Sequence, residues 1–167
     1  GGAGGHRRGE AEYRKHRDRA FAGAGADGEV HGGAGAMSNE IESAQMAGVE
    51  AGQDFAIFQN YGYQGLYGGL GAKEIHARKG LKENEQILDH MGSTELAANL
   101  FRATQTDEKL RRENIRGKEK ANQTHYEVGR KVRQTIAELG GTMPEDLPTP
   151  EKSIRQIESE QKKRLKG

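Results

Sequence analysis

The chain has 167 residues, of which 32% are apolar, 31% are charged and 25 are glycine. This composition supports one small core with solvated extensions and excludes two full globular domains. The chain has no cysteine, which excludes disulfides, thiol catalysis and thiolate metal sites. No apolar run reaches the roughly 20 residues of a membrane-spanning helix, and the first residues lack the apolar stretch of a secretory signal. We therefore expect a soluble, cytoplasmic protein with no membrane partner.

The formal net charge is only +1, but the charges are unevenly distributed. Residues 37–60 include four acidic side chains and no lysine or arginine. Residues 109–133 include nine basic side chains and three acidic ones. Such asymmetry is typical of a protein that meets a polyanion on one side.

Residues 1–36 are rich in glycine, with eleven glycines and only three large apolar side chains. This composition predicts a disordered tail of glycine, alanine and arginine. Composition changes abruptly at Met37. A tag, an out-of-frame translation and a misplaced start would each produce that change, and each would make the tail non-native.

The first ordered segment is expected to be helical and then irregular. Ser38 or Asn39 can cap a helix, Gly52 interrupts it, and Asp54 begins a second short helix. Residues 61–71 contain five glycines among eleven residues, which predicts a compact wrap and not a regular helix. A phosphate-cradling loop is disfavoured there because no strand pattern precedes the glycines.

Further helices are predicted along the rest of the chain. A short helix over 72–79 ends at Gly80, and a second helix follows it and ends at Gly92. A longer helix begins at residue 93, which serves as its cap, and runs through residue 110, with Leu96, Leu100 and Phe101 at helical spacing.

After Gly117 a helix is predicted with an apolar stripe formed by Val128, Val132, Ile136 and Leu139. A proline-rich connector then leads to a last helix with Thr149 as its cap and Pro150 at its first position. No segment alternates with the two-residue period of a strand. The predicted fold is all-α: a small, irregular multi-helix domain over 37–158, with the disordered tail before it and a frayed, charged C-terminal helix end at 159–167.

Catalysis, metal binding and a cofactor are not expected. His76, His90 and His125 are separated by 14 and 35 residues, which matches no helical metal-ligand motif. No nucleophile motif is present. His90 is interpreted as a residue of a helix interface.

Basic side chains are the better candidates for a site, because arginine makes multi-donor contacts to phosphate and each neutralised phosphate releases counterions. Arg78 and Lys79 are expected to lie on the surface, so that replacing both leaves folding unaffected. The alternative is a solvated surface whose basic groups pair with glutamates at helical spacing. Tyr61, Tyr63 and Tyr67 are expected in the core and not as platforms for bases. The candidate contacts to DNA or a partner are Lys73, His76, Arg78, Lys79, Lys82, Arg111, Arg112, Arg130, Lys131 and Arg133.

Three long segments carry a resemblance to a known family. They are DFAIFQNYGYQGLYGGLGAKEIHARKGL (54–81), ILDHMGSTELAANLFRATQTDEKLRRE (87–113) and HYEVGRKVRQTIAELGGTMPEDLPTPEKSI (125–154). Over about residues 47–157 the chain closely resembles the C-terminal portion of the bacterial DNA-damage-inducible protein D family. The resemblance implies a non-enzymatic protein of the SOS response that modulates recombinase filaments on single-stranded DNA.

Members of that family also have an N-terminal region similar to phage-type antirepressor (BRO-like) domains, to which residues 1–36 show no likeness. The chain is therefore expected to be a truncated or stand-alone relative. The alternative function is a helical protein-binding module that remains when the DNA-binding half is lost. Its contact surfaces would be the acidic segment 40–50 and the apolar segment 61–70.

Overall fold

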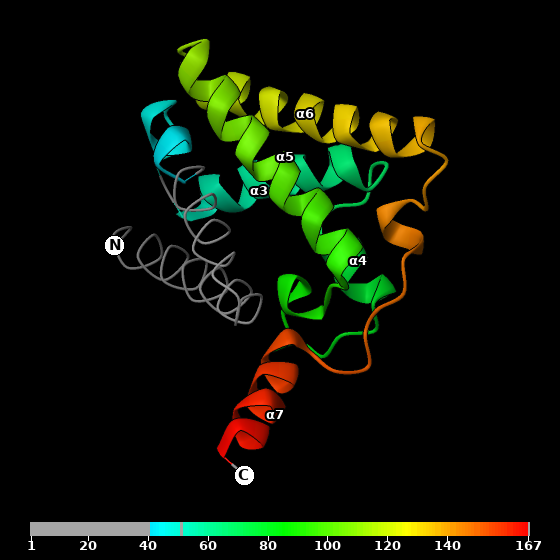
Figure 1. The fold of residues 1–167 in the computed structure, drawn as a ribbon. Helices are drawn as coiled ribbons and strands as arrows, with labels where there is room; N and C mark the ends of the chain where they lie inside the picture. Colours follow the sequence, from blue (N-terminus) through cyan, green and yellow to red (C-terminus); the bar gives the residue numbers. More distant parts are fainter. Residues whose placement is uncertain (1–40, 51, 167) are drawn as a thin grey trace.

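The computed structural model describes residues 41–50 and 52–166, and within them the fold is all-α, as predicted (Figure 1). The described residues contain no strand. The predicted tail at 1–36 lies outside them. Residues 41–46 are helical. The elements that follow are α3 (Gly52–Leu66), α4 (Ala72–Arg78), η1 (Ile87–His90), α5 (Ser93–Arg112), α6 (Lys118–Glu138), η2 (Pro144–Asp146) and α7 (Ile154–Lys166), where η denotes a 3₁₀ turn.

Helix α3 is longer than predicted, because the interpretation of its glycines was wrong. Residues 52–66 form one continuous helix that packs chiefly along α6 (Figure 1). Gly62 and Gly65 of α3 face Gly129 of α6: a Cβ on Gly65 would collide with the Tyr126 carbonyl, and one on Gly129 would lie 2.9 Å from the Gly62 carbonyl oxygen. Close backbone packing thus offsets the roughly 1 kcal/mol that each helical glycine costs relative to alanine.

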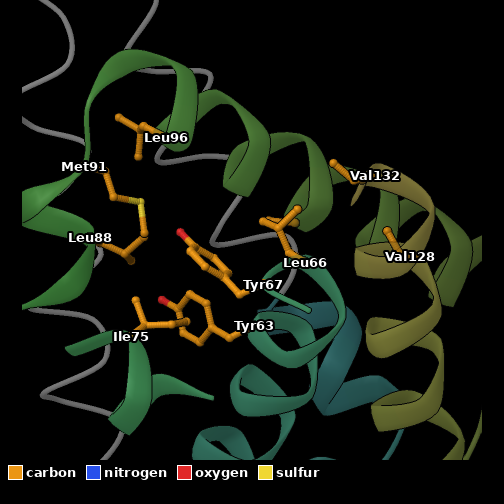
Figure 2. Packing of buried hydrophobic residues seen from close by; sticks show 10 residues of the cluster. Tyr63, Leu66, Tyr67, Ile75, Leu88, Met91, Leu96, Val128 and Val132 are labelled. Atoms are coloured by element: carbon orange, nitrogen blue, oxygen red, sulfur yellow. The ribbon is translucent and has the colours of Figure 1, made fainter. Parts of the chain in front are cut away.

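The core consists of two clusters of buried side chains. The larger one surrounds Tyr63, Leu66 and Tyr67 at the end of α3, which meet Ile75 and Leu96 there (Figure 2). The smaller cluster lies at the other end of α3, around Phe58 and Leu110. The prediction that the tyrosines are core residues is confirmed for Tyr63 and Tyr67, whereas Tyr61 is 36% exposed.

Two apolar residues of the predicted stripes lie at the surface. Phe101 is 51% exposed, because it follows Leu100 directly and adjacent helical residues point about 100° apart. Leu100 itself is partly buried against the larger cluster. Leu139 is 80% exposed and caps α6 at its C-terminal end.

Two predicted helix boundaries are also wrong. The second helix, expected to end at Gly92, is only the turn η1, and Met91 after it is already extended, with φ −115° and ψ 138°. Helix α7 begins four residues later than predicted, because Ser153 and Gln156 cap it reciprocally. The Ser153 amide donates to the Gln156 side chain at 2.7 Å, and the Gln156 amide donates to the Ser153 hydroxyl at 3.1 Å. Helix α7 buries none of its side chains and projects from the other helices (Figure 1).

Across the described part of the chain, no helix combines the length and the apolar character needed to cross a membrane.

Candidate nucleic-acid interface

Lys79, a candidate contact residue, points into the protein and not into solvent. Its ammonium donates to the Glu95 carboxylate at 2.7 Å and to the His90 carbonyl at 3.0 Å. The side chains of Lys79 and Glu95 are only 6% and 1% exposed. The expectation that Lys79 is a surface residue is therefore wrong, and its charge is committed to holding the end of α4 against the start of α5.

The buried ion pair belongs to a larger polar network. The Tyr67 hydroxyl donates to the Glu95 carboxylate, and the Asn99 amide donates to the Tyr67 oxygen at 3.1 Å. Burial, together with the nearby Glu95 charge, holds the pKa of Tyr67 far above its ordinary value of 10.0. Tyr67 is thus a neutral hydrogen-bond donor within the core.

The network continues through Arg102 to His125, both of which are buried. Arg102 donates to Nε2 of His125 and, at 3.3 Å, to the Asn99 side-chain oxygen. Nδ1 of His125 lies 2.8 Å from the Phe58 carbonyl oxygen. Since a carbonyl only accepts and a guanidinium only donates, His125 is neutral and carries its proton on Nδ1. These contacts join α3, α5 and α6 and account for the burial of the histidine.

Arg78 and Arg133 are brought together by the acidic turn η2. Arg78 donates to the Glu145 carbonyl and to the Asp146 carboxylate, each at 2.8 Å. Arg133 donates to both carboxylate oxygens of Glu145, at 2.8 and 2.7 Å. The hydrogen bond to Glu145 is the main cause that raises the pKa of Arg133. Burial favours the neutral form of Glu145, but the hydrogen bond and charge of Arg133 outweigh it and lower the pKa of that carboxyl.

Three further candidates have intramolecular partners. His76 Nε2 lies 3.0 Å from the Glu85 carbonyl oxygen. Arg111 pairs with Asp107 at 2.8 Å and Arg112 with Glu108 at 2.7 Å, each one helical turn away. The hydrogen bonds to these carboxylates raise the pKa values of Arg111 and Arg112. This pairing matches the alternative of a solvated, self-paired surface.

Four candidates remain as exposed cations. Lys73, Lys82, Arg130 and Lys131 form no ion pair within residues 41–50 and 52–166. Arg130 and Lys131 are adjacent, exposed residues of α6. Arg130 points away from the buried side chains of Val128 and Val132, and Lys131 points about 100° from Arg130 around the helix. They line one groove, which Lys73 and Lys82 do not reach.

That groove, here called the α3–α6 groove, has a volume of about 610 Å³ and lies between the end of α3, the Gly68–Gly69 turn and α6. Tyr126 lines it, with the Arg130 guanidinium 6.0 Å from the centre of its ring. Tyr126 was not among the predicted site residues. It lies four residues before Arg130 on a helix, and this spacing makes the two side chains neighbours on the helix surface. The groove is lined by Gln64, Gly65, Gly68, Gly69, Tyr126, Glu127, Arg130, Lys131, Arg133, Gln134, Ala137 and Met143.

A metal centre finds no support in the side-chain arrangement. Among the residues that the structure describes, no three histidine, aspartate or glutamate side chains gather in a way that could hold a metal ion.

Comparison with known proteins places the chain in a family. The family model described as the DinD C-terminal domain matches residues 36–157. The chain is 71% identical over 119 residues to the DNA damage-inducible protein D of Escherichia coli (strain K12), an alignment that covers 71% of this chain and 43% of the relative. The chain thus spans less than half the length of that curated relative, and no solved structure matches it. Since the family model covers well over half of its residues, the chain belongs to the DinD C-terminal domain family.

Proposed function

We propose that this chain is a non-enzymatic accessory module of the bacterial DNA-damage response, and that it contacts single-stranded DNA, free or within a recombinase filament, in the cytoplasm. The name of the Escherichia coli relative, DNA damage-inducible protein D, supports a role of this chain in the damage response. The observation that carries the DNA contact is the pair Arg130 and Lys131, two adjacent exposed cations beside a groove and without a carboxylate partner among the described residues.

Unpaired cations favour a polyanion for a physical reason. An arginine already bonded to a carboxylate must break that bond before it can bind phosphate, whereas Arg130 and Lys131 need only shed water. Each phosphate they neutralise releases condensed counterions, which supplies free energy that falls with rising salt. Contacts of this kind bind the backbone without reading the sequence, as expected for a protein that acts wherever single-stranded DNA accumulates.

The buried ionisable groups support a non-enzymatic role. Lys79 and Glu95 neutralise one another, and His125 is held neutral by Arg102 and the Phe58 carbonyl. Each of these side chains is bonded to a neighbouring helix or turn. Their partners account for their burial without a reaction.

The test is a titration of a fluorescently labelled single-stranded oligonucleotide, free or coated with purified recombinase, at low and high salt. We expect anisotropy to report binding of the free strand at low salt and a steep loss of affinity as salt rises. Displacement of recombinase from the coated strand would support action on the filament. Absence of binding to both forms at low salt would contradict the proposal.

A second candidate, a protein-binding module, is favoured by apolar side chains on the described surface. Ile57 and Tyr61 lie one turn apart on α3 and are 41% and 36% exposed. Of the two surfaces expected for this function, the apolar segment 61–70 is corrected, because its Leu66 and Tyr67 are buried in the core. Binding to recombinase without DNA, insensitive to salt and lost in Ile57→Ser, would favour this candidate over DNA contact.

A further inference from the structure

We infer that the α3–α6 groove binds one unpaired nucleotide of a DNA single strand, with the base against Tyr126 and the adjoining phosphates at Arg130 and Lys131. This inference rests on the proposed function and assigns it to one place on the molecule.

The size and lining of the groove suit a nucleotide. Its volume of about 610 Å³ lies within the range of roughly 300–1,000 Å³ that is usual for small-molecule sites. One wall includes the exposed turn Gly68–Gly69, which carries no side chains. Gly69 has φ +99°, and a Cβ placed there would meet no atom within 4 Å, so this rim is open. A sugar–phosphate chain can therefore approach the turn closely.

The charges of the groove favour an anion at one edge only. Arg130 and Lys131 are exposed, and Glu127, one turn before them, is the acidic residue of the lining. Arg133 also lines the groove but serves as a structural element, because it donates to Glu145 and, at 3.1 Å, to the Leu66 carbonyl. The phosphate contacts are thus assigned to Arg130 and Lys131, and Glu127 opposes them.

Tyr126 provides the surface for the base. Its ring is half-buried on α6, and the Arg130 guanidinium lies 6.0 Å from the ring centre. Stacking of a base on an aromatic ring is tolerant of sequence and accounts for much of the affinity of single-strand binders. A duplex would not offer this contact, because its bases are already paired and stacked. The groove therefore distinguishes unpaired from paired DNA.

A fluorescence experiment localises the contact, since the chain contains no tryptophan. Tyr126→Trp introduces a single reporter in the groove, and Tyr61→Trp introduces one at an exposed position on α3. On addition of oligo(dT) at low salt, we expect the indole fluorescence of Tyr126→Trp to be quenched and to saturate at the same concentration as anisotropy of the labelled strand. The fluorescence of Tyr61→Trp should stay unchanged. Quenching in Tyr61→Trp alone would overturn the inference.

Affinity measurements separate the two parts of the site. Tyr126→Leu should weaken oligo(dT) binding about fivefold or more, and should leave binding of an abasic oligonucleotide nearly unchanged. Arg130→Ala combined with Lys131→Ala should weaken both ligands. The matched control is Lys163→Ala with Arg164→Ala, an adjacent exposed lysine and arginine on α7. Glu127→Gln should strengthen binding.

The outcomes keep the inference and the proposed function apart. If the wild-type chain binds oligo(dT) but the groove variants and the α7 control behave alike, the groove is not the site, and DNA contact as such still stands. If the wild-type chain binds no single strand at low salt, the DNA contact itself is wrong and the inference falls with it. Thermal melting of each variant verifies that a loss of binding is not a loss of fold.

Discussion

The ammonium of Lys79 lies 2.7 Å from the carboxylate of Glu95, and both side chains are almost completely buried. Lys79 caps the C-terminal end of α4, and Glu95 occupies the first turn of α5, where the helix dipole favours a negative charge. The pair therefore connects the C-terminal end of α4, which favours a positive charge, with the N-terminal end of α5, which favours a negative one. It also lies at the centre of the polar network that includes Tyr67.

The first prediction concerns this pair. Lys79→Ala should reduce the free energy of unfolding by about 3–5 kcal/mol, because it leaves Glu95 charged and buried without its partner. Lys82→Ala, three residues along and exposed, should change it by no more than about 0.5 kcal/mol. Urea unfolding followed by circular dichroism measures both. Equal midpoints for the two variants would show that the Lys79–Glu95 contact does not stabilise the fold.

The second prediction concerns the contact between α3 and α6. Gly129→Ala should destabilise the protein even though alanine is the better helix former by about 1 kcal/mol. The new methyl group would lie 2.9 Å from the Gly62 carbonyl oxygen and from the Leu66 amide, both of them backbone atoms. Gly92→Ala is the control, since its Cβ meets nothing within 4 Å, and its effect should stay within about 1 kcal/mol. A higher melting temperature for Gly129→Ala would contradict the close packing of the helices.

The third prediction concerns acid stability. The pKa of Glu145 is lowered below its ordinary value of 4.5 in the folded chain, so the group stabilises the fold when ionised. This contribution is complete above the ordinary pKa and is lost as the pH falls through the lowered one. Glu145→Gln should cost about 1.5–3 kcal/mol at neutral pH, and the difference from wild type should vanish at acidic pH. A difference that stays constant from neutral to acidic pH would contradict the role of the charge.

The fourth prediction concerns the core. Leu66 is fully buried at the end of α3, and Leu66→Ala should cost about 2–5 kcal/mol. Leu139, 80% exposed, is the matched control, and Leu139→Ala should change the free energy of unfolding by about 0.5 kcal/mol or less. If the denaturant midpoint shifted equally for both variants, Leu66 would not be a core residue.

Local signals in the sequence predicted part of this structure. Gly80, with positive φ, follows a helix end where the sequence predicted it, and Leu96 and Leu100 of α5 contribute to the core at their predicted spacing. The stripe of Val128 and Val132 is likewise buried, as its helical spacing predicted. Each of these features depends on residues that are close together in the sequence.

Features that depend on distant residues were not predicted. Gly62 and Gly65 look like helix breakers until Gly129 is placed opposite them, 64 residues beyond Gly65. Lys79 looks like a surface lysine until Glu95 is found beside it, because a charged side chain is rarely buried without a partner. Arg133 looked as available to a ligand as Arg130 and Lys131. The structure shows that Glu145 of the turn η2 pairs with it, and no local pattern in the sequence connects these two residues.

The central claim, that Arg130 and Lys131 bind the backbone of single-stranded DNA, is tested most directly by the salt dependence of affinity. The association constant for oligo(dT) should be measured over a salt series for the wild-type chain and for Arg130→Ala combined with Lys131→Ala. Each lost phosphate contact lowers the steepness of log K against log salt by about 0.7 for a single strand, so we expect a slope that is shallower by about 1.4 in the double variant. Two superimposable slopes would contradict the claim.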